Sequence, residues 1–213
     1  MSKVWWRWLL FVGLSLAFLG AALVLRTVRN GPEPALPPMV KVISATLVND
    51  TQRLPGFSLV RAGPLLTNAD LQGHWTLMFF GYTYCPDFCP TSLAAVKEMR
   101  NRLQAAGVVS PEVVFVSVDP ARDTPEHLAL FAQLFDPAFI GATGDDAALA
   151  PLVKNLGVHY QRQDTQDKKH YTVDHSEAIY LIDPHGRLKA VFSWPHDPAA
   201  MAADYSKIIS AGG

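Results

Sequence analysis

One stretch, TLMFFGYTYCPDFCP at residues 76–90, indicates both the fold and the chemistry of this chain. Its first five residues, 76–80, form a continuous apolar run typical of a buried strand. Pro90 suits the first position of a helix. Apolar residues at helical spacing then continue toward a stop at Gly107, namely Leu93, Val96, Met99 and Leu103. The stretch therefore predicts a strand, a loop with two cysteines, and a helix.

Cys85 and Cys89 are the only cysteines of the chain. Their spacing allows two thiolates to bind one soft metal ion and also allows a strained redox disulfide, whereas thioredoxin-type motifs have two intervening residues. Cys89 is predicted at the helix N-terminus, where the helix dipole favours a thiolate over a thiol and makes this cysteine a better nucleophile and a better ligand. A structural disulfide is a third interpretation, although closing so short a loop gains little stability.

The N-terminus predicts a membrane anchor. Eighteen uncharged residues, Trp8–Leu25, nearly match the roughly 20 that cross a bilayer and exceed the length of a secretory signal. We therefore expect residues 1–29 to be a cytoplasmic tip and an uncleaved transmembrane helix, with the rest of the chain exported. Four prolines mark residues 30–41 as a tether. Residues 42–213 are expected to form one domain.

The composition of the exported part limits its partners. After residue 30 the chain has 19 acidic and 14 basic residues, a formal charge of −5, which argues against binding to nucleic acid. An exported domain meets an oxidising compartment, so thiols that bind a metal there need a partner that keeps them reduced. A thiol reductase is therefore an expected partner.

The pattern after the cysteine helix alternates between strands and helices. It predicts a buried parallel strand, two helices with recognisable N-caps, a hairpin around an Asp-Pro-His-Gly turn, and a last helix. This order indicates an α/β fold of thioredoxin type. The predicted elements are Val113–Val118, Thr124 to about Phe135, Asp145 or Asp146 to Gly157, Glu177–Ile182 with Leu188–Phe192, and Asp197 to about Ser210.

Histidine is the candidate for a third ligand beside the cysteines. His175 stands immediately before the predicted strand Glu177–Ile182, where a side chain can point across the end of a sheet; a histidine buried in the core or a loop is the alternative. The other six are expected to be solvated on the surface: His74, His127, His159, His170, His185 and His196.

Three motifs in order, residues 80–91, residues 117–125 and Asp174-His175-Ser176, strongly resemble the Sco (SenC) family of copper chaperones for cytochrome c oxidase. The resemblance covers about residues 54–210. It implies a membrane-anchored, thioredoxin-like domain with an inserted β-hairpin. It also implies that Cys85, Cys89 and His175 bind one copper ion.

The sequence departs from the family pattern at two positions. Tyr84 replaces a usual histidine, and Phe88 replaces a usual smaller aliphatic residue. Neither position is a ligand in the family, so we expect altered access or redox behaviour with copper binding retained.

The donor chemistry agrees with the resemblance. Thiolates suit Cu(I), and an added imidazole lets the same site hold Cu(II). Zinc accepts these donors too, but structural zinc normally has four protein ligands and the sequence offers no convincing fourth. Asp87 and Asp174 lie beside the predicted ligands and could orient His175 or a partner.

The resemblance implies a function in oxidase assembly and no enzymatic turnover. The chain would be a chaperone anchored in the bacterial inner membrane and facing the periplasm. It would deliver copper to the binuclear copper site of cytochrome c oxidase, or reduce the cysteines of that site. Its partners would be the oxidase subunit that carries the site, a thiol reductase and another periplasmic copper chaperone.

The cysteine pair also fits other functions. An exported thiol-disulfide oxidoreductase or peroxidase would use Cys85 and Cys89 as attacking and resolving thiols, and would not need His175. A copper-responsive sensor would need a signalling partner that the sequence does not reveal.

Overall fold

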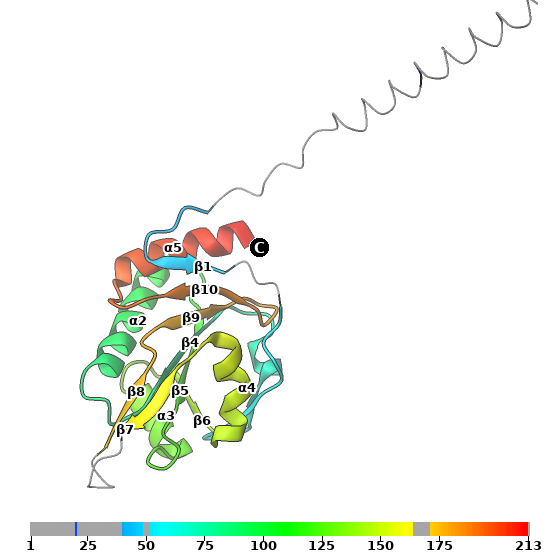
Figure 1. The fold of residues 1–213 in the computed structure, drawn as a ribbon. Helices are drawn as coiled ribbons and strands as arrows, with labels where there is room; N and C mark the ends of the chain where they lie inside the picture. Colours follow the sequence, from blue (N-terminus) through cyan, green and yellow to red (C-terminus); the bar gives the residue numbers. More distant parts are fainter. Residues whose placement is uncertain (1–19, 21–39, 49–51, 164–170, 213) are drawn as a thin grey trace, which may run out of the picture. The chain divides into compact units, whose positions relative to one another are not determined.

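The computed structural model describes residue 20 and residues 40–48, 52–163 and 171–212. The chain divides into two compact units, Met1–Met39 and Val40–Gly213, and nearly all described residues belong to the second (Figure 1). Apart from Gly20, the predicted anchor Trp8–Leu25 lies outside the described residues, as does most of the predicted tether. Within the described ranges, no helix has the length and apolar composition needed to span a bilayer.

A mixed eight-stranded sheet forms the centre of the second unit, in the order β1-β10-β9-β4-β5-β6-β2-β3 (Figure 1). The neighbours β4, β5 and β6 run parallel, and the other pairs are antiparallel. The strands are β1 (Ala45–Leu47), β2 (Ser58–Arg61), β3 (Leu66–Thr67), β4 (Thr76–Gly81), β5 (Glu112–Ser117), β6 (Ile140–Thr143), β9 (Ile179–Ile182) and β10 (Leu188–Phe192).

Helices cover the sheet and confirm an α/β architecture. Helices α2 and α5 pack against each other, whereas α3 packs on β6 and β2. Figure 1 shows α2 and α5 on one side of the sheet and α4 on the other. The helices are η1 (Asn68–Leu71, a 3-10 helix), α2 (Phe88–Ala105), α3 (Pro125–Gln133), α4 (Asp146–Leu156) and α5 (Pro198–Gly212).

The two central strands fix the edge at which the cysteine loop emerges. All six residues of β4 are buried, and β5 is buried after its first residue, as expected for parallel strands covered on both faces. Their register runs from Thr76↔Glu112 to Gly81↔Ser117. Because the strands are parallel and in step, the loops that follow Gly81 and Ser117 leave the same edge of the sheet side by side.

Helix α2 begins two residues earlier than predicted. Asp87 is its N-cap and Phe88 its first residue, so Pro90 occupies the third position instead of the first. Proline is tolerated there because the first N–H groups of a helix have no partner within the helix. The predicted apolar face is confirmed, and it is buried at Leu93, Val96, Met99 and Leu103.

Several other predicted elements are confirmed with small shifts at their ends. Thr124 caps α3 and Asp145 caps α4, each by accepting a hydrogen bond from a backbone N–H. Gly157 ends α4 in the left-handed conformation, with φ of 67°. The predicted hairpin is β9 with β10, but β9 begins at Ile179 and Glu177 lies before it.

Strand β6 is missing from the sequence prediction, which runs directly from one helix to the next. It is only four residues long and contains Gly141, a residue depleted in strands. A Cβ at Gly141 would lie 2.4 Å from the carbonyl oxygen of Leu128 in α3. The close approach of α3 to the sheet therefore requires glycine at this position. Because glycine is unusual in strands, the sequence pattern does not indicate a strand here.

A separate two-stranded sheet, β7 (Tyr160–Gln163) with β8 (Thr172–His175), is an antiparallel hairpin outside the main sheet. Most of the side chains of β7 are exposed, so the sequence offers no apolar signal for this strand. His175 ends β8, whereas the sequence placed it in the approach to the next strand. His175 thus belongs to the β7–β8 hairpin and is paired with Tyr160.

The domain begins with a short strand, β1, that is attached to α5 through a buried carboxylate. Asp204 of α5 accepts hydrogen bonds from the backbone N–H groups of Ile43, Ser44 and Ala45, at 2.6–3.1 Å. The Ser44 hydroxyl adds a further bond at 3.0 Å. The first described strand is therefore held at both of its sides, by β10 and by α5.

Candidate metal centre

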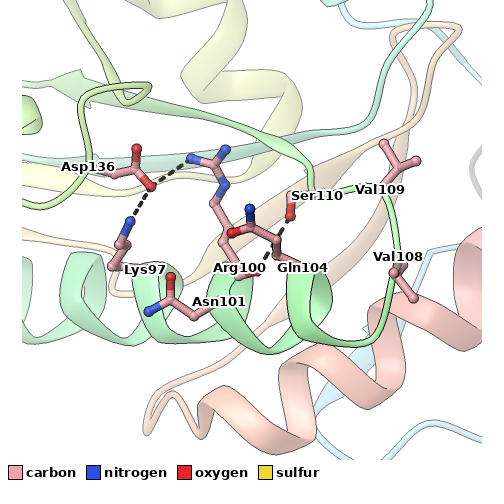
Figure 2. Close-up of a pocket in the computed structure, with 9 residues that line it drawn as sticks. Lys97, Arg100, Asn101, Gln104, Val108, Val109, Ser110 and Asp136 are labelled. Carbon is pink, nitrogen blue, oxygen red and sulfur yellow. Dashed lines mark hydrogen bonds and ion pairs between the residues drawn. The ribbon is translucent and has the colours of Figure 1, made fainter.

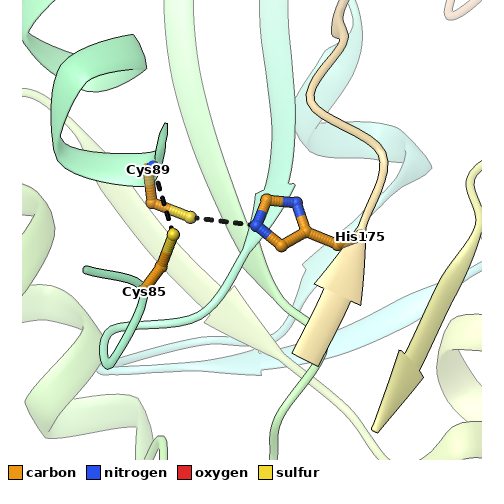
Figure 3. Close-up of side chains that lie close together, drawn as sticks. All are labelled: Cys85, Cys89 and His175. Carbon is orange, nitrogen blue, oxygen red and sulfur yellow. Dashed lines mark hydrogen bonds between the residues drawn. The ribbon is translucent and has the colours of Figure 1, made fainter. Parts of the chain in front are cut away.

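Three separate elements carry the predicted ligands. Cys85 lies in the loop after β4, Cys89 in the first turn of α2, and His175 at the end of β8. Their ligand atoms all lie within 4.8 Å of one another. Figure 3 shows the two sulfurs and the imidazole pointing toward one another from these three elements. The fold thus brings together groups that are up to 90 residues apart in the sequence.

The contacts within this cluster are close. Nε2 of His175 lies 3.4 Å from Sγ of Cys89, and the backbone N–H of Cys89 donates to Sγ of Cys85 at 3.4 Å (Figure 3). Both cysteines are buried free thiols, and His175 is half-buried. A soft metal ion placed among the three atoms would need the sulfurs deprotonated and Nε2 free.

The two thiols differ strongly in acidity. A hydrogen bond from the Cys89 thiol lowers the pKa of Cys85 to about 4, against the effect of burial and with help from His175 and backbone N–H groups. Burial raises the pKa of Cys89, and the hydrogen bond to Cys85 raises it further. The sequence-based prediction that the helix N-terminus favours a thiolate at Cys89 is therefore wrong. Cys89 has no exposed surface, and its own N–H points to the sulfur of Cys85.

Backbone and aromatic groups orient His175. Its Nδ1 lies 3.0 Å from the carbonyl oxygen of Ser176, an arrangement that places the proton on Nδ1 and leaves Nε2 free to bind a metal. The rings of Phe79 and Tyr82 meet the imidazole edge to face, at centroid distances of 6.2 and 5.8 Å. Burial alone would lower the pKa of His175, but its hydrogen bonds to Cys85 and Ser176 raise it.

The donor set is that of a soft-metal site. Two sulfurs and one imidazole suit Cu(I), Cu(II) or zinc, and any fourth ligand would be a water molecule or a group from a partner. Within the described residues, this is the one group of three metal-binding side chains that lie close together.

Comparison with known proteins identifies the family. The SCO1/SenC family model matches residues 49–210, which is most of the chain. The chain belongs to the SCO1/SenC family. A SCO2-like protein of Rickettsia conorii is 34% identical over 186 residues, covering 85% of this chain and 87% of the relative.

Solved structures of SCO1/SenC proteins share the fold. Arabidopsis thaliana ScoI with copper bound is 31% identical, with a TM-score of 0.70 over 75% of this chain and 99% of that one. Bradyrhizobium japonicum ScoI with copper bound is 36% identical, with a TM-score of 0.64 over 74% of this chain and 99% of that one. These likenesses confirm the predicted thioredoxin-like fold. The chain spans only about half the length of the mitochondrial SCO2 homologs of cattle and human.

The two positions that depart from the SCO1/SenC pattern both lie at the rim of the site. Tyr84 is 58% exposed, and its ring faces that of His127 at 6.2 Å. Phe88 is 39% exposed and packs edge to face on Trp194 at 5.3 Å. Both side chains present aromatic surface next to the cysteines, and their effect on access and redox behaviour stays a prediction.

The two aspartates proposed to orient the ligands make other contacts. Asp87 is exposed and receives a weak hydrogen bond from Thr91 at 3.4 Å, and Asp174 is exposed and receives one from Gln163. Across the described residues, neither carboxylate is a hydrogen-bond partner of His175, whose Nδ1 has Ser176 instead. A role of either aspartate toward a partner stays a prediction.

His196 differs from its predicted state. It is half-buried, with Nδ1 3.1 Å from the hydroxyl of Ser92 and Nε2 3.3 Å from the carbonyl oxygen of Phe192. Burial lowers its pKa. His127, His159 and His185 are exposed as predicted, His74 is half-buried beside Glu112, and His170 lies outside the described residues.

Sequence reasoning missed the polar residues that support the site. Asp119 and Asp123 are both 1% exposed, and they lie in the loop after β5, at the edge of the sheet where the cysteine loop also emerges. Their position at the end of a buried parallel strand was the signal in the sequence that could have identified them.

A pocket elsewhere, between the second half of α2 and residues 107–110, contains none of the three predicted ligands (Figure 2).

Proposed function

We propose that this protein is a copper chaperone that binds one copper ion through Cys85, Cys89 and His175 and serves the assembly of cytochrome c oxidase. The observation that carries the proposal is the convergence of two sulfurs and one imidazole nitrogen within 4.8 Å. Copper is the preferred metal because thiolates bind Cu(I) strongly and the imidazole extends the site to Cu(II). The copper-bound relatives in the same family support this choice.

In this proposal the protein's own groups prepare the site for copper. Cys85, with its pKa lowered to about 4, is already a thiolate at neutral pH. Cys89 must lose its proton when the metal binds, so binding releases a proton and weakens as the pH falls. The carbonyl oxygen of Ser176 holds the proton of His175 on Nδ1 and keeps Nε2 directed at the sulfurs.

The cellular setting belongs to the same proposal. We propose that residues 1–29 anchor the protein in a bacterial inner membrane, that residues 30–41 form a tether, and that the domain of residues 42–213 faces the periplasm. The uncharged span Trp8–Leu25 supports the anchor. Copper delivery to the binuclear copper site of the oxidase, or reduction of its cysteines, would then occur in the same compartment as that site.

Removal of the histidine tests the proposal. In His175→Ala the two thiolates still bind Cu(I), but Cu(II) loses the nitrogen donor that it prefers. We expect the thiolate-to-Cu(II) absorption band to be lost or strongly shifted, and oxidase assembly in cells to fail, while the folded domain persists. His185→Ala, at an exposed histidine away from the cluster, is the control and should behave as the wild type. An unchanged Cu(II) band in His175→Ala would falsify the three-ligand site.

A thiol-disulfide oxidoreductase is the second candidate, and the acidity of Cys85 favours it. A thiol with a pKa of about 4 beside a second, buried thiol is an arrangement that suits disulfide exchange. This function predicts a different response to His175→Ala from the one that the copper site predicts. Cys85→Ser or Cys89→Ser would abolish cellular activity, while His175→Ala would keep disulfide exchange and oxidase assembly close to wild type.

A further inference from the structure

The segment from the last residue of β5 to the N-cap of α3, Ser117–Thr124, which we call the bridging loop, contacts the segment that carries Cys85. Asp123 accepts hydrogen bonds from the backbone N–H of Thr83 at 3.0 Å and from its hydroxyl at 2.5 Å. Ser117 donates its hydroxyl to the same carboxylate at 2.5 Å, and Asp123 is 1% exposed. Thr83 lies two residues before Cys85, so this buried carboxylate fixes the approach to the cysteine pair.

The bridging loop also contacts the strand that carries His175. Asp119 is buried and accepts a hydrogen bond from the phenol of Tyr171 at 2.5 Å. Arg122 donates from Nη1 to the carbonyl oxygen of Tyr171 at 2.9 Å. Tyr171 directly precedes β8, whose last residue is His175. One loop therefore contacts both the segment that carries Cys85 and the strand that carries His175.

Arg122 is the side chain that touches both segments at once. Its guanidinium carbon lies 3.6 Å from the centroid of the Tyr171 ring, and 4.8 and 5.6 Å from those of Tyr84 and Tyr82. Its Nε donates to Asp119 at 2.5 Å, and only 14% of its side chain is exposed. Nη2 is buried without a hydrogen-bond partner in the described part of the chain, and the guanidinium as a whole lies over aromatic rings.

We infer that Arg122 is a positioning residue that holds β8, and with it His175, at binding distance from Cys85 and Cys89. This inference rests on the proposed function, because it concerns the geometry of the copper site. A planar guanidinium can donate to a carboxylate and a carbonyl oxygen while it stacks on a ring, and an ammonium group cannot do all three. Lysine at this position would keep the charge and lose the bridge.

The inference predicts which form of copper is affected. If Arg122 positions His175, its loss weakens the bond that depends on the imidazole and spares the two sulfurs. Changes to groups that orient a metal ligand typically reduce metal affinity about 10- to 100-fold. We therefore expect Arg122→Lys to reduce Cu(II) affinity by about that factor and Cu(I) affinity by no more than about threefold.

Arg100 provides a matched control. It is also mostly buried, at 19% exposed, pairs with Asp136 at 3.1 Å, and lies 5.5 Å from the ring of Phe139 (Figure 2). It lines the pocket described above, which contains none of the predicted ligands. Arg100→Lys should thus cause a comparable loss of stability without changing the copper site.

The experiment compares Arg122→Lys, Arg100→Lys and His175→Ala in the full chain. Cu(II) affinity and the Cu(II) absorption and electron paramagnetic resonance spectra are measured, together with the melting temperature. In the metal-free protein, amide hydrogen exchange across β8 should be faster in Arg122→Lys than in Arg100→Lys. The inference holds if Arg122→Lys shifts the Cu(II) spectrum toward that of His175→Ala and Arg100→Lys does not.

The outcomes separate the inference from the function on which it rests. If His175→Ala itself leaves Cu(II) binding unchanged, the proposed copper site is wrong. If His175→Ala weakens Cu(II) binding but Arg122→Lys matches Arg100→Lys in spectra and exchange, the positioning role is wrong. Should Arg122→Lys fail to fold, Arg122→Gln replaces it, because it removes the guanidinium and with it the link between Asp119 and Tyr171. A wild-type Cu(II) spectrum in a folded Arg122→Gln protein would then overturn the inference.

Discussion

Gly81, the last residue of β4, determines how closely Cys89 approaches the sheet. A Cβ at this position would lie 2.5 Å from Sγ of Cys89 and 2.9 Å from the ring of Phe115. Both distances are too short for real contacts, and Phe115 is itself held in the core. The absence of a side chain at Gly81 is therefore part of the construction of the site.

Gly81→Ala should displace the sulfur of Cys89 and weaken Cu(I) binding. We also expect a loss of about 1–3 kcal/mol in the free energy of unfolding, because the added methyl group overpacks the core. Urea denaturation and a Cu(I) competition assay measure the two effects. Gly56→Ala, where a Cβ meets no atom within 4 Å, should change neither. Wild-type Cu(I) affinity in a folded Gly81→Ala protein would show that this glycine does not position the sulfur.

Single residues differ in how far the sequence reveals their roles. The cysteine pair was recognisable from its spacing alone, whereas His175 could be chosen among seven histidines only through the family resemblance. The sequence could not give the acidity of Cys89, because burial depends on the packed domain. The partners of Arg122 come from three segments of the chain, so its role is visible only in the folded protein.

At the scale of elements, buried strands and capped helices were predictable and exposed or short strands were not. Strand β5 and helix α4 carry strong local signals, a β-branched apolar run in one and an N-cap with a terminal glycine in the other. Strands β6 and β7 lack such signals, because one is shaped by contact with α3 and the other is mostly exposed. Their formation depends on tertiary packing.

The attachment of β1 to α5 predicts a pH-dependent stability. Burial would raise the pKa of Asp204, but hydrogen bonds from the N–H groups of Ser44, Ile43 and Ala45 lower it below its ordinary value. The carboxylate therefore contributes stability above the unfolded pKa of about 3.9, and this contribution is lost as the pH falls through the folded pKa.

Asp204→Asn should destabilise the domain by about 1–3 kcal/mol at pH 7, since an amide cannot accept as many of these hydrogen bonds. The difference from wild type should shrink as the pH drops below about 4, because the unfolded carboxyl then takes up a proton, and it should vanish once the native carboxyl, whose pKa is lower, is protonated as well. Urea denaturation at several pH values measures it. The control Asp197→Asn changes an exposed cap at the start of the same helix and should be nearly neutral. A difference that does not depend on pH would contradict a role for the charge.

For the whole molecule, redox state and metal binding should exclude each other. Only thiolates bind the metal, so a disulfide between Cys85 and Cys89 removes two of the three proposed ligands. We expect copper to raise the melting temperature of the reduced chain and to protect both cysteines from alkylation. The oxidised chain should show no copper-dependent shift. Thermal unfolding and mass spectrometry after alkylation provide the measurements, and equal stabilisation of both forms would exclude the cysteines as ligands.

The unequal depth of the two sulfurs gives the site a direction. Cys85 is 8% exposed and Cys89 has no exposed surface, although they lie only four residues apart in the sequence. A sulfur from another protein can therefore collide with Cys85 but not with Cys89. For both proposed functions, transfer of a metal ion and disulfide exchange, we therefore expect the first bond to another protein to form at Cys85. Exchange with another protein at this centre is therefore expected to begin and end at Cys85.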